Sequence, residues 1–277
     1  MTSDMEKEIK KYLRTGQANP YASAWPGQHA LECYQAQSKG LQAALLAELK
    51  RRAGKKTPPA VPDNLDLIAY TRERVAPMVQ GLFPPDEQPV IQGILERAMV
   101  FLTAQGIEKA IIDEHFPHTA WTLANIYLES LNLKGLDGKR FPVVGMSSGD
   151  KCYISTDYFY EKCPFADFLV HEAAHTFHNI RRDAAGLPLP RRGYKWLLLL
   201  DFNKRELFAY ACEVYSRIIT LGATRKERLS SIEEYSCKVK LPAGYVGKNE
   251  LIALLKEAVG ARNGWKRILK RCSPDKR

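Results

Sequence analysis

Long apolar runs are missing from this sequence of 277 residues. The longest, WLLLL at residues 196–200, lies between Lys195 and Asp201 and falls far short of the ~18 apolar residues that a membrane-spanning helix needs. The first residues, MTSDMEKEIKKYLR, are charged and lack the apolar segment of a secretory signal. The sequence therefore predicts neither a membrane span nor a signal peptide.

Cysteine is also sparse, with six residues and no CxxC pair. So few and such scattered cysteines do not make a disulfide scaffold in a chain of this length. Free thiols are typical of a reducing compartment, so we expect a cytoplasmic protein. The cysteines are Cys33, Cys152, Cys163, Cys212, Cys237 and Cys272.

Acidic residues are in the minority: 31 Asp and Glu stand against 41 Lys and Arg, for a net charge of +10. This surplus favours an acidic partner, such as nucleic acid, anionic lipid or an acidic protein. Part of it lies in two basic stretches, residues 50–56 and 265–277. The sequence shows no helix-turn-helix, zinc-finger or RNP signature, so a nucleic-acid-binding role rests on charge alone and stays open as a rival.

Apolar residues at three- and four-residue spacing predict helices along most of the chain. Residues 55–64 contain three prolines and read as a linker after a helical N-terminal segment. Two β-prone runs within residues 141–156 flank SSGD and predict a hairpin directly before a further helix. We expect an α+β fold that is predominantly α-helical, divided into residues 1–56, a core at 63–222 and a basic helical extension at 223–277.

Histidine is rare, yet three of the six histidines fall within residues 171–178. On a helix whose first turn holds Pro164, His171 and His175 lie one turn apart on one face, so both rings can point at one ion. Glu172 lies about 100° around that helix and can contact a water beside the ion. This HExxH arrangement is typical of zinc peptidases, in which the glutamate is the general base. The alternative, an ordinary helix with surface histidines, is disfavoured by its apolar neighbours.

His178 lies on the same face, but about 10 Å further along the axis than His171. One zinc ion with bonds of about 2.1 Å could not comfortably take all three histidines from a straight helix. His178 is therefore expected to support a ligand, to donate to the transition state, or to interact with the helix C-terminus. The third metal ligand must come from elsewhere in the chain.

A second helix, predicted at residues 201–219, repeats the spacing of the first. Glu206, Tyr210 and Glu213 form a polar stripe along an otherwise apolar element. Glu213 is expected to be buried, and a buried carboxylate needs a cation or a histidine as partner. For Glu206 the alternative is a capping interaction with Asn203, three residues earlier.

The HEAAH and ELFAYACE segments together resemble the gluzincin zinc peptidases, in particular the lethal-factor and Mlc-titration-factor peptidases. The resemblance covers residues 141–219. It implies a zincin-like core holding one Zn2+ by His171, His175 and Glu206, with Glu172 as base and Glu213 as supporting carboxylate. The sequence departs from those families at Leu199, where they carry a tyrosine seven residues before the glutamate ligand.

The residue that donates to the transition state is therefore open among Tyr194, Tyr210 and His178. Asp167, one turn before His171, could accept the free ring N–H of that histidine. A first-turn acid stabilised by the helix dipole is an equally good interpretation of Asp167.

Substrate contacts are expected on both sides of the histidine helix. In zincins a sheet edge binds the substrate as an added strand, and the candidate strand is Lys151, Cys152, Tyr153, Ile154 and Ser155. Loops 156–164 and 181–195 would border the cleft. Paired arginines at 181–182 and 191–192 hint at an acidic substrate. His115 and His118 are expected in a loop or at a helix end rather than in a second metal site.

The sequence thus predicts a zinc metallopeptidase that hydrolyses a protein or peptide substrate. Two rivals remain: a basic nucleic-acid-binding or regulatory protein with a vestigial site, and a protein whose zinc only ties two helices together. A closed fourth coordination position, filled by Glu213 or His178, would favour the structural site.

Overall fold

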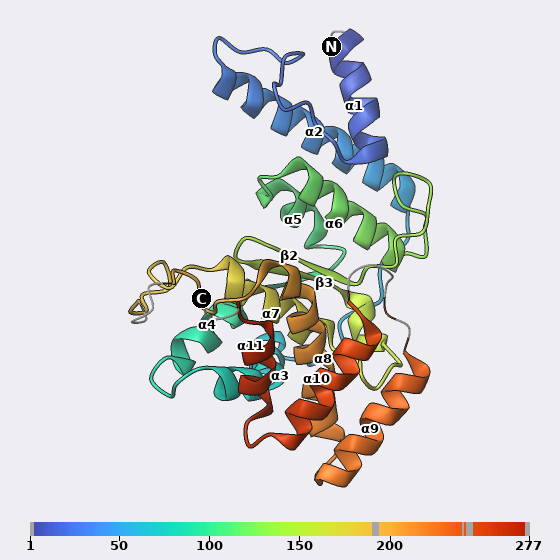
Figure 1. Ribbon diagram of the computed structural model, residues 1–277. Helices are drawn as coiled ribbons and strands as arrows, with labels where there is room; N and C mark the ends of the chain where they lie inside the picture. Colours follow the sequence, from blue (N-terminus) through green and yellow to red (C-terminus); the bar gives the residue numbers. More distant parts are fainter. Residues whose placement is uncertain (1–2, 190–193, 240, 242–245, 275–277) are drawn as a thin grey trace. The chain divides into compact units, whose positions relative to one another are not determined.

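The computed structural model describes residues 3–189, 194–239, 241 and 246–274. The chain is mostly α-helical with one three-stranded sheet (Figure 1), which confirms the coarse α+β expectation. Of the helices described, none is both long and apolar enough to cross a membrane. The helices are α1 (Ser3–Thr15), α2 (Ala30–Ala53), α3 (Leu67–Leu82), α4 (Gln88–Ala98), α5 (Ile107–Asp113), α6 (Pro117–Ser130), α7 (Phe168–Asn179), α8 (Arg205–Leu221), α9 (Arg225–Lys238), α10 (Lys248–Gly260) and α11 (Gly264–Cys272). The strands are β1 (Met99–Leu102), β2 (Gly145–Ser148) and β3 (Lys151–Ser155).

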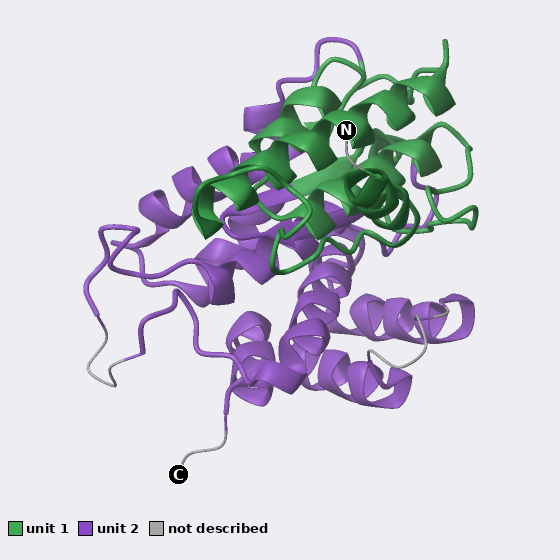
Figure 2. Ribbon diagram, turned by 90° about the horizontal axis from the view of Figure 1, so that it is seen from above, with its two compact units in different colours: residues 1–62, 101–144, 153–160 green, residues 63–100, 145–152, 161–277 purple. Residues whose placement is uncertain are grey.

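The chain divides into two compact units, coloured separately in Figure 2. Unit 1 comprises residues 1–62, 101–144 and 153–160, and unit 2 comprises residues 63–100, 145–152 and 161–277. The change after Pro62 falls in the expected linker. No unit boundary falls at the predicted division after residue 222, because α8 packs against α9, α10 and α11 within unit 2. The packing of α8 against α10 and α11 joins residues that are far apart in the sequence.

A buried carboxylate organises the N-terminal part of unit 1. Both oxygens of Glu8, on α1, are used: Oε1 accepts from the backbone N–H of Asn19 and from Gln37 on α2, and Oε2 accepts from the Trp25 indole. The three bonds are 3.1, 2.6 and 2.9 Å long. They tie α1, the segment after it and α2 together, and satisfy a charge that would be costly to bury alone.

The predicted hairpin is present in the fold. Strands β2 and β3 are joined at Gly149, whose φ of +58° lies in the left-handed region that favours glycine. The sheet order is β1-β3-β2, so β3 is the middle strand. The hairpin itself is local in sequence, whereas the pairing with β1 joins residues about fifty positions apart.

Helix α7 is buried over almost its whole length in unit 2. It packs against α8, α3 and β2, and its Phe177 contacts the ring of Phe83 at 5.1 Å between centroids. The helix begins at Phe168, four residues after Pro164, which lies in a turn. The predicted start at Pro164 was therefore wrong, because the side chain of Asp167 caps the helix by accepting from the Val170 N–H.

Candidate metal centre

The two histidines of the HEAAH segment lie one turn apart on the same face of α7, as predicted. His171 and His175 both lie on the face that meets α8, and both are buried. Their rings are 5.1 Å apart between centroids, and the two Nε2 atoms are 3.3 Å apart. Two imidazole nitrogens are thus held close together inside the protein, an arrangement that a shared cation would stabilise.

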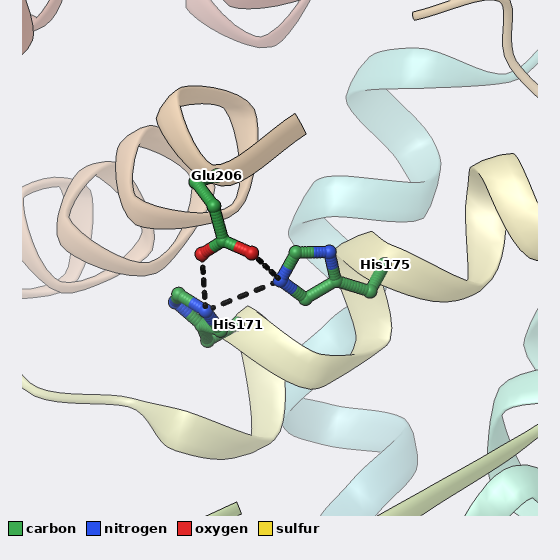
Figure 3. A group of neighbouring side chains, drawn as sticks. All are labelled: His171, His175 and Glu206. Atoms are coloured by element: carbon green, nitrogen blue, oxygen red, sulfur yellow. Dashed lines mark hydrogen bonds and ion pairs between the residues drawn. The ribbon is translucent and has the colours of Figure 1, made fainter. Parts of the chain in front are cut away.

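Glu206 reaches this pair from the first turn of α8 (Figure 3). The short 3-10 turn Phe202–Lys204 precedes the helix and is capped by Asp201, which accepts from the Asn203 N–H. Asn203 is therefore not the residue that caps α8. The capping alternative for Glu206 does not describe this helix start, and the carboxylate instead faces the two histidines.

The three side chains form one compact group of ligand-capable atoms. Oε2 of Glu206 is 3.8 Å from Nε2 of His171, and Oε1 is 3.5 Å from Nε2 of His175. All the ligand-capable atoms lie within 4.8 Å of one another. Two ligand atoms bound to one tetrahedral zinc at about 2.1 Å are about 3.4 Å apart, so the spacing of this group fits a zinc ion.

Glu213 has a different place, on the other nitrogen of His171. Its Oε2 is 3.0 Å from Nδ1 of His171, and its Oε1 accepts from the backbone N–H of Asp167 at 3.0 Å. An ionised carboxylate can only accept, so Nδ1 of His171 carries a proton, and in the neutral ring Nε2 is left with its lone pair toward the group. Glu213 thus orients a candidate ligand rather than completing the ligand set.

The electrostatics of the group suit a cation. Burial by itself lowers the pKa of His171, but the hydrogen bond and charge of Glu213 outweigh it and raise that pKa to about 9. Burial and the neighbouring positive charges hold the pKa of His175 well below its ordinary value. A zinc ion bound at Nε2 of His171 would replace the second proton of that ring. The donor set it would meet is two imidazole nitrogens and one carboxylate oxygen, which are ligands that zinc accepts.

Glu172 lies beside the group and is not one of its ligand-capable members. The residue is buried, and burial raises the pKa of its carboxyl to about 7, with smaller contributions from Glu206 and Glu213. The charge of His171 acts in the opposite direction, as does a hydrogen bond from Ser147, on β2. A carboxyl group with a pKa near neutrality can both accept and return a proton. Ser147 was not expected from the sequence, where its only signal is its place in the hairpin before α7.

Asp167 acts at the start of α7. Its side chain caps the helix and pairs with Arg74 of α3, while Glu213 is the carboxylate at Nδ1 of His171. The first-turn interpretation therefore describes Asp167 better than the suggested bond to His171. Asp167 is connected to the group of His171, His175 and Glu206 only indirectly, because its backbone N–H donates to Glu213, which in turn contacts His171.

The three candidate donors lie in different surroundings. Tyr210, on α8, packs its ring against His171 at 4.6 Å between centroids. His178 is buried, its ring is 5.3 Å from that of His175, and burial together with the charge of Arg205 lowers its pKa to about 4. Tyr194 is half-buried in the irregular segment before the bridge between Arg181 and Trp196. Tyr210 and His178 are thus brought to the histidines, and no described contact does the same for Tyr194.

The expected substrate strand needs correction. Lys151–Ser155 forms β3, but β3 is paired on both sides in the sheet, so no backbone edge remains for an added strand. The edge strand next to α7 is β2. The sequence could not distinguish them, because the outer partner of β3 is β1, far upstream.

Two of the expected substrate-binding arginines are engaged elsewhere. Arg181 pairs with Asp183 at the surface, and Arg182 is buried against Glu87 and donates to the carbonyl of Pro188 at 2.8 Å. Neither leaves a guanidinium for an acidic substrate. The second pair, residues 191–192, lies outside the described residues.

The remaining histidines, His29, His115 and His118, are not members of the group. His118 lies in the first turn of α6 and stacks on Trp121 at 5.9 Å between centroids, and His115 lies in the exposed segment before that helix. Within the described residues, His171, His175 and Glu206 are the group that could hold a metal ion. The loop and helix-end positions expected for His115 and His118 are those observed.

No family model matches the chain, and neither a curated protein nor a solved structure matches it. The class of this protein therefore has to be argued from its own residues.

Proposed function

We propose that this protein is a zinc-dependent peptidase of the gluzincin type, with a zincin-like core in unit 2. One observation carries the proposal: Glu206 meets the Nε2 atoms of His171 and His175 while Glu172 stands beside them outside the group. Of the described residues only these three form such a group, which leaves further coordination positions of a zinc ion open to a substrate. The resemblance to lethal-factor and Mlc-titration-factor peptidases rests on the same residues.

Each nearby side chain has a defined task in this proposal. A zinc ion held by the three ligands would act as a Lewis acid toward the peptide carbonyl and acidify a water molecule. Glu172 takes the proton of the attacking water and returns it to the leaving amine, for which its raised pKa is suited. Glu213 holds His171 in the tautomer that presents Nε2. Tyr210 and His178 remain the candidates to donate to the developing oxyanion.

In this proposal the peptide substrate pairs with β2, whose outer edge is free of other described strands. Its residues Met146–Ser148 are half-buried, and Ser147 contacts Glu172. An extended peptide beside β2 would therefore run past the general base. Backbone pairing of this kind binds peptides with little regard to their sequence.

The rivals find less support. In a purely structural site a fourth protein ligand would be expected, but Glu213 is bonded to Nδ1 of His171 and lies outside the ligand group. Of the basic residues invoked for nucleic acid, Lys50, Arg51 and Arg52 are paired with Glu108 and Glu48, while Arg267 and Arg271 lie against Glu257.

All six cysteines are free thiols, which supports the proposed cytoplasmic location.

The test compares Glu172→Gln with the wild type. Glutamine keeps the size of the side chain and still accepts a hydrogen bond, but it cannot carry the proton. We expect the variant to retain zinc while cleavage falls at least ~10²–10⁴-fold, as for other general bases. Because no substrate is known, proteome-derived peptides are incubated with each protein and new termini are identified by mass spectrometry. Equal cleavage by both zinc-loaded proteins, or no cleavage by either, would sink the peptidase proposal.

A further inference from the structure

Arg205 stands in an unfavourable place for a cation. It is the first residue of the 17-residue helix α8, where the helix dipole favours negative charge. Its guanidinium lies over the ring of Phe202, 5.0 Å from the centroid, although Phe202 itself is 76% exposed. The cation–π contact with Phe202 thus places the charge of Arg205 at a helix end where a positive charge is unfavourable.

Arg205 also lacks a partner of its own within the part of the chain that the structure describes. No carboxylate there forms an ion pair with it, and its Nε is buried without a hydrogen-bond partner. By contrast, Arg181 and Arg182 each have a carboxylate partner. Leaving a charged donor unsatisfied at a partly buried position is costly, so such a group calls for an explanation.

The position of Arg205 ties it to the candidate metal centre. It directly precedes Glu206, a member of the group, in the first turn of α8, and its charge acts on His178, whose ring lies 5.3 Å from that of His175. His178 is buried as well, and its Nδ1 is without a hydrogen-bond partner among the described residues. Two buried nitrogen atoms, Nε of Arg205 and Nδ1 of His178, are thus without a hydrogen-bond partner among the described residues.

We propose that Arg205 binds a carboxylate of the substrate next to the three metal ligands. This inference rests on the proposed peptidase function and names its substrate class: peptides with a carboxylate close to the scissile bond. The carboxylate is either an acidic side chain or the free C-terminus, because both present the same pair of oxygens to a guanidinium. Glu206 is not the carboxylate that pairs with Arg205, because its two oxygens face His171 and His175.

The experiment measures peptide binding by the zinc-loaded Glu172→Gln variant, so that binding is separated from cleavage. Three probes differ in one group: acetyl-Ala-Ala-Gln-Ala-amide, the same peptide with Glu for Gln, and acetyl-Ala-Ala-Gln-Ala with a free C-terminus. The affinity for each probe is measured by isothermal titration calorimetry in every variant. The ¹⁵N NMR signal of the Arg205 Nε–H, which is assigned from its loss in Arg205→Gln, reports whether the carboxylate binds at that side chain. The matched control is Arg217→Gln, which removes the same charge from the other half of α8, where Arg217 donates to the carbonyl of Pro164.

We expect at least one carboxylate probe to bind about 10–100-fold more tightly than the neutral probe, as for hydrogen bonds to charged groups. Arg205→Gln should abolish that preference, and Arg217→Gln should keep it. Tighter binding of the Glu probe identifies a side-chain carboxylate as the group recognised, and tighter binding of the probe with a free C-terminus identifies the terminal carboxylate. Equal binding of all three probes, or a preference that survives Arg205→Gln, overturns the inference.

Failure of the inference is distinguishable from failure of the proposed function. If the wild type cleaves peptides but shows no preference for a carboxylate, the peptidase stands and the role of Arg205 falls. If the Arg205 signal responds to a carboxylate probe but Glu172→Gln leaves cleavage unchanged, the anion-binding residue stands and the peptidase falls.

Discussion

Nδ1 of His171 lies 3.0 Å from Oε2 of Glu213, and this contact decides which of two carboxylates on α8 faces the candidate metal position. Glu206 and Glu213 are two turns apart on one stripe of the helix, so both can approach α7. Because Glu213 occupies Nδ1 of His171, Nε2 of that ring is left for Glu206 and His175. The same carboxylate accepts from the backbone of Asp167, so both of its oxygens are used.

The first prediction separates the two glutamates by their effect on zinc affinity. Glu206→Gln removes a ligand and should abolish tight binding. Glu213→Gln should weaken zinc binding about 10–100-fold, the usual effect of losing a carboxylate behind a histidine ligand. Its amide group offers one oxygen where two donors, His171 and the Asp167 N–H, need acceptors. Competition with a chromophoric chelator measures both affinities, and a larger loss for Glu213→Gln would reverse the assignment.

The second prediction concerns the start of α7. Asp167→Ala removes both the helix cap and the charge that faces Arg74, and we expect it to lower the free energy of unfolding by about 2–4 kcal/mol. Asp167→Asn keeps a good capping group but not the charge, so its loss should be smaller. Urea unfolding followed by circular dichroism measures both. Equal losses in the two variants would show that capping contributes nothing.

The candidate site was predictable from the sequence where its geometry is local. His171 and His175 are one helical turn apart, and any helix places them on one face. The choice between Glu206 and Glu213 depends instead on how α8 is rotated against α7, which the spacing on α8 alone does not fix. The family resemblance supplied that choice.

The fold shows the same division between local and distant contacts. The hairpin of β2 and β3 follows from SSGD and its flanking residues, and it was predicted. The place of β3 in the middle of the sheet depends on β1, and the assignment of the last three helices to unit 2 depends on their packing against α8 and α3. Such contacts arise from matched surfaces, which a single sequence does not display.

The third prediction tests the packing of α11 on α3. A Cβ atom at Gly81 would lie 2.0 Å from Cδ1 and 2.7 Å from Cβ of Trp265, close to the backbone of α11. Gly81→Ala should therefore destabilise the protein by about 1–3 kcal/mol through overpacking. Gly93→Ala is the matched control, because on α4 the new atom meets only the flexible end of Arg97 at 3.3 Å. It should stabilise by roughly 0.5–1 kcal/mol, and stabilisation by both changes would contradict this packing.

The fourth prediction concerns acid stability and Glu48 of α2. Its hydrogen bond to Arg51, with help from Arg52, lowers the pKa of its carboxyl from 4.5 to about 2. The folded protein thus holds the ionised form more strongly than the unfolded chain does. The resulting stabilisation is fully present above pH 4.5 and is lost as the pH falls toward 2. We expect Glu48→Gln to be less stable than the wild type at pH 6 and to approach it by pH 2.5, as measured by urea unfolding. A difference that stays constant over this range would refute the linkage.

The last prediction is that zinc stabilises the folded protein by binding to side chains of both α7 and α8. Because the three ligands belong to two helices, an ion bound to them favours the folded state over the unfolded chain. At a free zinc concentration a thousand times the dissociation constant the gain is about 4 kcal/mol. Thermal unfolding of wild-type protein should therefore shift upward on addition of zinc and back on addition of a chelator. His175→Ala removes one ligand while leaving the other histidines and all six cysteines as adventitious sites. An equal shift in that variant would show that zinc stabilises the chain from somewhere other than the group of His171, His175 and Glu206.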